Sequence, residues 1–275
     1  MRNYVQAGQV FTNLPILVIP HTNPSNSSKA SFLGDANFPE SALAFYKDGR
    51  ITFFRHIYEQ YSRLGFTYFE DRPLAIASLE KRLLRTFESK GAFGVFESYL
   101  QRGLLWQRPK DFATTLTRIE FKKGPSVPSW SWMAYRGPIQ YVDIPFDGAD
   151  WSKDDVETPF NTGTDSWYKR TSTSDEDTRS TDLRCMARGL RMNEEDVIKR
   201  LVLDDPDGSR DISNFKGVVL GKERKFTTPG AALHWVLVIR PILPKRSYLL
   251  YERVGVASLL ASHLDYQDTV SVRIR

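Results

Sequence analysis

The sequence predicts an α+β protein in which a small helical subdomain packs on a mostly antiparallel β-sheet domain. Two observations lead to this prediction. Apolar residues recur at helical spacing in the stretch that ends at residue 106, whereas short β-prone segments separated by turn residues fill the chain from residue 117 onward. Helices and strands that are segregated along the chain are typical of the α+β class.

Four regions are expected along the 275 residues. Residues 1–50 are rich in Asn, Ser, Pro and Gly and should form a poorly structured lead-in. Residues 51–146 should form a helical and tryptophan-rich region. Residues 147–182 are polar and longer than a normal connection, which predicts a mobile linker or loop. Residues 183–275 should be β-rich and complete the sheet domain.

Three helices are expected first. One begins near Thr52 and ends near Gly65, and a second follows Asp71, whose side chain can cap it, with Pro73 tolerated in the first turn. A third, shorter helix is expected from Phe93 to Leu100. The apolar stripes of the first two helices consist of Phe54, Ile57, Tyr58 and Tyr61, and of Ile76, Leu79, Leu83 and Phe87.

Nine short strands are expected after these helices. They are Thr117 to Phe121, Pro128 to Tyr135, Ile139 to Ile144, Leu183 to Leu190, Ile198 to Leu203, Gly217 to Leu220, Leu233 to Ile239, Ser247 to Val256 and Thr269 to Ile274. Clusters of turn residues separate them, which favours antiparallel connections between neighbours.

Composition and charge argue against several classes of protein. The net charge is +5, with 38 Lys and Arg against 33 Asp and Glu, and the basic residues are dispersed, so no nucleic-acid partner is expected. No apolar run approaches the roughly 20 residues needed to cross a bilayer, so no membrane span is expected. The single cysteine, Cys185, cannot form an internal disulfide, which favours a cytoplasmic location.

No motif predicts a catalytic residue. The four histidines share no short spacing and one cysteine cannot build a thiolate site, so neither a metal nor another cofactor is expected. The G-x-S-x-G elbow, the P-loop and G-x-G-x-x-G are all missing from the sequence. Adjacent carboxylates such as Glu70-Asp71 would point apart rather than converge on one substrate.

The tryptophans are the most distinctive side chains. Trp130 and Trp132 alternate with serines in Pro128-Ser129-Trp130-Ser131-Trp132, so a strand would place both indoles on one face. Such a pair can stack on a ligand or a partner, or it can pack under the helices. Core packing is the favoured interpretation.

Four motifs occur in a fixed order, namely Tyr58 to Thr67, Glu70 to Leu79, Gly103-Leu104-Leu105-Trp106 and Pro128 to Trp132. This series resembles fungal heterokaryon incompatibility (HET) domain proteins, in which a helix ending in Tyr-Ser precedes an Asp-Arg helix, Leu-Leu-Trp and Pro-Ser-Trp-Ser-Trp. Tyr251 to Val256 also resembles a strand near the end of such proteins. The signature residues that carry the resemblance are Tyr61, Ser62, Asp71, Arg72, Trp106, Pro128, Ser129, Trp130, Trp132, Arg253 and Gly255.

The resemblance covers only the C-terminal half of that family. The family's Leu-Ser-Tyr-x-Trp-Gly and Arg-x-Trp-Thr-x-Gln-Glu motifs have no counterpart in residues 1–50, and Pro73 and Ser78 replace the usual Leu and Gly. The missing half resembles a Toll/interleukin-receptor-like unit, in which nucleotide-cleaving chemistry would lie. No catalytic residue is therefore carried over to this chain.

The resemblance implies a non-catalytic protein of fungal non-self recognition or programmed cell death, acting in the cytoplasm through contacts with a protein partner. Arg72 is then expected to act as a latch that reaches a carbonyl or carboxylate across the layer. One alternative is an enzyme or ligand-binding protein whose pocket for a nucleotide or secondary metabolite contains Arg72, Trp130, Trp132 and Tyr141. The other is an inactive truncated fragment.

Overall fold

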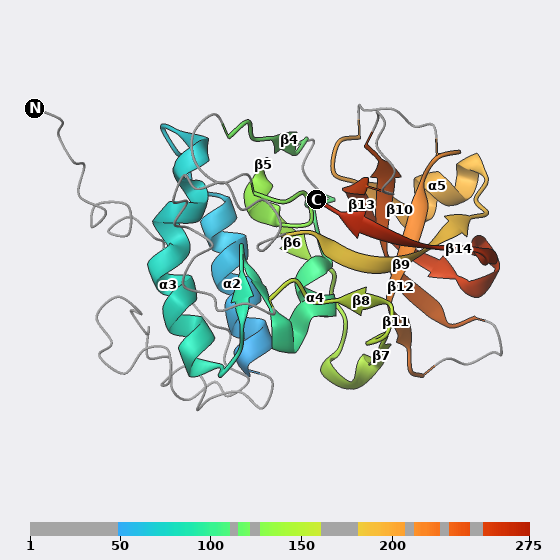
Figure 1. Cartoon of the computed structure of the whole chain (residues 1–275), viewed down its shortest axis with the longest axis horizontal. Coiled ribbons are helices and arrows are strands. Elements are labelled where there is room, and N and C mark those ends of the chain that lie inside the picture. Colours follow the sequence, from blue (N-terminus) through green and yellow to red (C-terminus); the bar gives the residue numbers. More distant parts are fainter. Residues whose placement is uncertain are drawn as a thin grey trace, which may run out of the picture.

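The computed structural model describes residues 49–110, 115–121, 127–160, 181–206, 212–225, 231–242 and 250–275, and it confirms the α+β class. Two long helices, α2 (Gly49–Ser62) and α3 (Arg72–Thr86), lie side by side at one end of the molecule, and the large sheet forms the other end (Figure 1). Short strands and turns lie between the two ends. The expected lead-in lies outside the described residues up to residue 48.

The two long helices follow the apolar periodicity of the sequence. Phe54, Tyr58 and Tyr61 of α2 are buried, as are Ile76 and Leu83 of α3. The expected cap on α3 is wrong. A 3-10 turn, η1 (Phe69–Asp71), runs directly into α3, so the residue before the helix already has helical backbone angles and its side chain makes no capping bond.

The expected third helix is replaced for the most part by a hairpin. Strands β1 (Gly91–Ala92) and β2 (Val95–Phe96) pair around Phe93 and Gly94, which have φ of 55° and 78°. Two positive φ values make the tight turn that joins antiparallel strands and interrupt any helix. Gly94 also lies so close to Trp132 that a Cβ would be 2.2 Å from the indole nitrogen. The helix α4 (Leu100–Leu104) begins only after the 3-10 turn η2 (Glu97–Tyr99).

The segment Pro128 to Tyr135 does not form the expected strand. It forms a turn and the 3-10 helix η3 (Trp132–Ala134), because the Ser131 hydroxyl accepts a hydrogen bond from the backbone N–H of Met133 and caps η3. Only its end enters a ladder, in which β5 (Tyr135–Arg136) pairs with β4 (Thr117–Arg118). A second short ladder joins β3 (Trp106–Gln107) to β6 (Gln140–Tyr141).

The large sheet contains eight strands in the described residues. They are β7 (Ala149–Trp151), β8 (Val156–Glu157), β9 (Leu183–Leu190), β10 (Leu201–Leu203), β11 (Lys216–Glu223), β12 (Leu233–Pro241), β13 (Leu250–Leu260) and β14 (Leu264–Ile274). The order is β7-β11-β12-β13-β14-β9-β8, with β10 on β13. All pairs are antiparallel except β13 with β14, and an additional β11–β9 pairing closes five strands into a ring.

Two expectations about this region are revised by the strand positions. Helix α5 (Glu194–Arg200) occupies the start of the segment Ile198 to Leu203, so only β10 is extended. Strands β7 and β8 lie within residues 147–182, which were expected to be a polar linker. Residues 161–180 of that segment lie outside the described residues.

Strand β12 shows how the sheet positions two cores. Trp235, Leu237 and Ile239 belong to a cluster that continues through the tryptophans to the helices, whereas Val236 and Val238 belong to a second cluster. Alternate residues of a strand point to opposite faces, so both faces of β12 are buried, which explains its continuous apolar run. The helices and the sheet therefore share one hydrophobic core.

Candidate functional site

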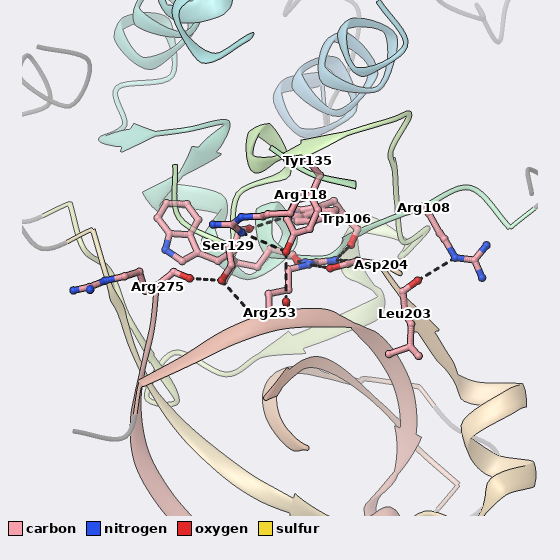
Figure 2. A network of polar contacts seen from close by, with 11 residues as sticks. Trp106, Arg108, Arg118, Ser129, Tyr135, Leu203, Asp204, Arg253 and Arg275 are labelled. Carbon is pink, nitrogen blue, oxygen red and sulfur yellow. Dashed lines mark hydrogen bonds and ion pairs between the residues drawn. The ribbon is translucent and has the colours of Figure 1, made fainter. Parts of the chain in front are cut away.

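Two signature residues, Trp106 and Ser129, contact Arg253, which β13 carries into the core. Figure 2 shows this network, in which Arg253 is only 2% exposed. Its Nε donates to Asp204 Oδ2 at 2.8 Å and its Nη2 to Asp204 Oδ1 at 3.1 Å. Its Nη1 donates to the Leu104 carbonyl at 2.7 Å, and Nη2 also donates to the Trp106 carbonyl. The guanidinium lies 3.3 Å from the centre of the Trp106 ring.

These contacts make a junction between sheet and helical region. Leu104 ends α4 and Trp106 begins β3, whereas Asp204 follows β10 on the sheet. A planar guanidinium suits this position because its donors diverge toward a carboxylate on one side and two carbonyls on the other. Burying both charges is compensated by their mutual hydrogen bonds.

The Pro-Ser-Trp-Ser-Trp motif supplies the second half of the junction. The buried Ser129 hydroxyl accepts a hydrogen bond from the backbone N–H of Arg253 at 3.0 Å and donates one to the carbonyl of Arg275. The indole N–H of Trp106 donates to the Trp130 carbonyl at 2.9 Å, and that of Trp130 donates to the Thr181 carbonyl at 2.9 Å. The motif is thus joined to β3, β13 and the end of β14.

Gly255 is required for β10 to reach β13. A Cβ at this position would lie 2.3 Å from the backbone oxygen of Val202 on the paired strand. Any larger residue would therefore push β10 away and move Asp204, which follows it, out of reach of Arg253. The Arg-x-Gly pattern of this strand thus has a local structural reason.

Arg72 forms the expected latch at the start of α3. Its guanidinium donates to the Ser62 carbonyl at 2.8 Å and to the Tyr135 carbonyl, and it lies 5.0 Å from the centre of the Trp132 ring. The Tyr61 hydroxyl donates to the Arg72 carbonyl at 2.8 Å. Burial lowers the pKa of Arg72 to about 10, so the side chain remains charged at neutral pH.

Tyr135 connects the two arginines, and sequence reasoning did not identify it. Its carbonyl accepts from Arg72, and its hydroxyl donates to the Arg253 carbonyl at 3.4 Å. Burial raises the pKa of Tyr135 to about 12, with a further contribution from the charge of Asp204. The only hint in the sequence was its position directly after the tryptophan motif. Arg72, Tyr135 and Arg253 thus form one polar chain through the shared core.

The side chains of two signature residues, Asp71 and Pro128, take no part in the contacts that link Arg72, Tyr135 and Arg253. Asp71 is exposed at the start of α3, and Pro128 is buried, with its carbonyl accepting a hydrogen bond from the backbone N–H of Ser131. Asp204, by contrast, is central to the junction and was not among the candidates. It is 3% exposed, and the two aspartates of the turn Asp204-Asp205 look alike in the sequence.

The residues expected to form a ligand pocket are not brought together at a surface. Arg72, Trp130 and Trp132 have no exposed area at all, because the helices, the hairpin and the sheet cover them. The predicted core packing of the two tryptophans is confirmed. Tyr141, which is 4% exposed, does line a cavity, but Arg72, Trp130 and Trp132 are not among the residues that line it.

That cavity, of about 500 Å³, lies where the β3–β6 ladder meets the sheet. Gln107 and Gln140 come from the ladder, Lys199 and Arg200 from the end of α5, and the floor from β10, β12 and β13. Its walls therefore come from the sheet end of the molecule and from the short strands between the two ends. Cavities between packed units are frequent positions for ligands.

The described residues suggest no covalent or metal chemistry. Within them, no group of three His, Cys, Asp or Glu side chains is placed to hold a metal ion. Cys185 is buried in β9, and this burial raises the pKa of its thiol, which keeps the thiol protonated and unreactive at neutral pH. No helix in this part of the chain is long and apolar enough to cross a membrane.

Comparisons with family models, with curated proteins and with solved structures found no match to this chain. The resemblance to HET domain proteins remains a prediction from the four ordered motifs and the Arg253 strand. Ten of the eleven signature residues are buried, all but Asp71, and several of them make the contacts described above between the helical region and the sheet.

Proposed function

We propose that this chain is a non-catalytic, HET-like protein that acts in fungal non-self recognition or cell-death signalling through contacts with a protein partner in the cytoplasm. The observation that supports the proposal most is the use of the signature arginines. Arg72 and Arg253 direct their guanidinium groups to internal carbonyls and to Asp204, not to a ligand space. Arginines whose donors are all directed into the core stabilise the fold and do not bind a ligand. A fold held in one shape can present a constant surface to a partner.

The hydrophobic core that the helices share with the sheet also supports the proposal. The junction fixes α2 and α3 on the sheet, so surfaces from both regions are presented to a partner as one rigid body. Pre-organisation of this kind lowers the entropic cost of binding.

Regulated expression of the chain in a filamentous fungus tests the proposal. We expect growth inhibition and loss of viability on induction, scored together with an immunoblot for the accumulated protein. The Arg253→Leu variant changes no exposed side chain but weakens the junction, so it should lose the inhibition when it accumulates to the wild-type level. Normal growth of cells in which the wild-type chain accumulates would contradict the proposal.

A further inference from the structure

The cavity beside the β3–β6 ladder is lined by two glutamine side chains, Gln107 and Gln140. Gln107 is 8% exposed and lines the cavity, and within the described residues its side-chain amide has no hydrogen-bond partner. An amide that faces a cavity keeps its donors and its acceptor available to a bound molecule. The amide of Gln107 is therefore available to a ligand in this cavity.

Gln140 adds a second amide to the same wall. The two glutamines are directly opposite each other in the antiparallel β3–β6 ladder, so their side chains project from the same face. In the part of the chain that the structure describes, the Gln140 amide has no partner either, and the same holds for the Ser258 hydroxyl on the cavity wall. Two primary amides side by side offer paired donors and acceptors, which match the edge of a heteroaromatic base.

The remaining walls suit a flat body. Val142, Val202 and Val256 line the cavity with aliphatic surface. The volume of about 500 Å³ lies within the usual range for small-molecule sites. In such a site the aliphatic side chains can pack against the two faces of a planar ring. The polar groups at one side can form hydrogen bonds with the edge of the ring.

Cations predominate at the cavity. Among the described residues, Lys110, Lys199 and Arg200 line it together with one carboxylate, that of Asp143. Lys110 has no carboxylate partner in the described residues. The two α5 cations form i,i+4 pairs, an exposed one of Lys199 with Glu195 and a half-buried one of Arg200 with Asp196 at 3.7 Å. An exposed pair is weak, so Lys199 remains accessible to an anion.

From this arrangement we propose that the cavity binds a nucleotide. Gln107 and Gln140 hold the edge of the base, the valines cover its faces, and Lys110 and Lys199 hold the phosphate at the rim. This site is separate from the Arg72–Arg253 network. It therefore differs from the ligand pocket that the sequence suggested around Arg72, Trp130 and Trp132.

Calorimetric titration of the full chain with AMP, GMP, CMP and UMP tests the proposal, with the nucleosides and inorganic phosphate as separate arms. We expect at least one nucleotide to bind about tenfold more tightly than its nucleoside and than phosphate, since both halves contribute. Gln107→Leu should weaken that binding about tenfold, and Lys110→Ala should weaken it and flatten its dependence on salt. The exposed residues Gln267 and Lys90 supply the matched controls Gln267→Leu and Lys90→Ala, which should bind as wild type.

Three results would overturn the proposal: no nucleotide binding at millimolar concentration, binding no tighter than that of phosphate, or affinities that Gln107→Leu and Lys110→Ala leave unchanged. If the melting temperature of Gln107→Leu is lower than that of the wild-type protein, the affinities of Gln140→Leu and of Lys110→Ala, at an exposed residue, are compared instead. Failure at this cavity would leave growth inhibition in the fungal host intact, so the two proposals fail separately.

Discussion

Replacing Arg253 with leucine is expected to lower the free energy of unfolding by about 3–5 kcal/mol. The variant would leave the Asp204 carboxylate buried without its guanidinium, and the carbonyls of Leu104 and Trp106 would lose a donor. Removing one partner of a buried ion pair is costly because the remaining charge cannot return to water. Urea denaturation followed by circular dichroism measures the difference.

Arg240→Leu is the matched control for this prediction. Arg240 lies on β12 and pairs with Glu252 at 2.7 Å, but its side chain is 45% exposed, so its loss should cost no more than about 1 kcal/mol. The double variant Arg253→Leu/Asp204→Leu should recover part of the loss, because no charge then remains buried. Equal stabilities for Arg253→Leu and Arg240→Leu would show that the junction is not a source of stability.

Arg72→Lys should cost about 2–3 kcal/mol although the charge is kept. A single ammonium cannot donate to the Ser62 and Tyr135 carbonyls together and cannot stack flat on Trp132 as the guanidinium does. One buried carbonyl is then left without a donor. The same urea titration measures the effect.

The matched control for the latch is Arg85→Lys, in the last turn of the same helix, where the side chain is exposed. It should change stability by less than about 0.5 kcal/mol. A cost for Arg72→Lys within that range would mean that the latch contributes charge alone and that its geometry is unimportant.

The sequence predicts those elements whose signal is local periodicity. Helix α2 agrees with expectation because its aromatic stripe is buried. Strand β9 has the expected bounds, Leu183–Leu190, and its residues alternate between buried and more exposed positions. The failures occur where a single backbone contact overrides the pattern. Phe93-Gly94 turns back because Gly94 fits against Trp132, and the tryptophan motif turns because Ser131 caps η3.

The junction is only partly predictable for a different reason. The motifs identify Arg72 and Arg253 as important, and the latch role of Arg72 follows from its place at a helix start. The partner of Arg253 does not follow, because Asp204 is 49 positions away and lies in an ordinary acidic turn. Tyr135 and Gln107 are similar cases, since each acquires its role only when β3, β5 and β6 are brought against the sheet.

Native-state hydrogen exchange most directly tests the central claim, that the Arg72–Tyr135–Arg253 chain joins helices and sheet into one cooperative unit. We expect the slowest amides of α3 and of β13 to open with the same free energy, equal to that of global unfolding. In Arg253→Leu both sets should fall together. Exchange of α3 at a free energy several kcal/mol below that of β13 in the wild-type chain would contradict the account, because the helical region would then unfold on its own.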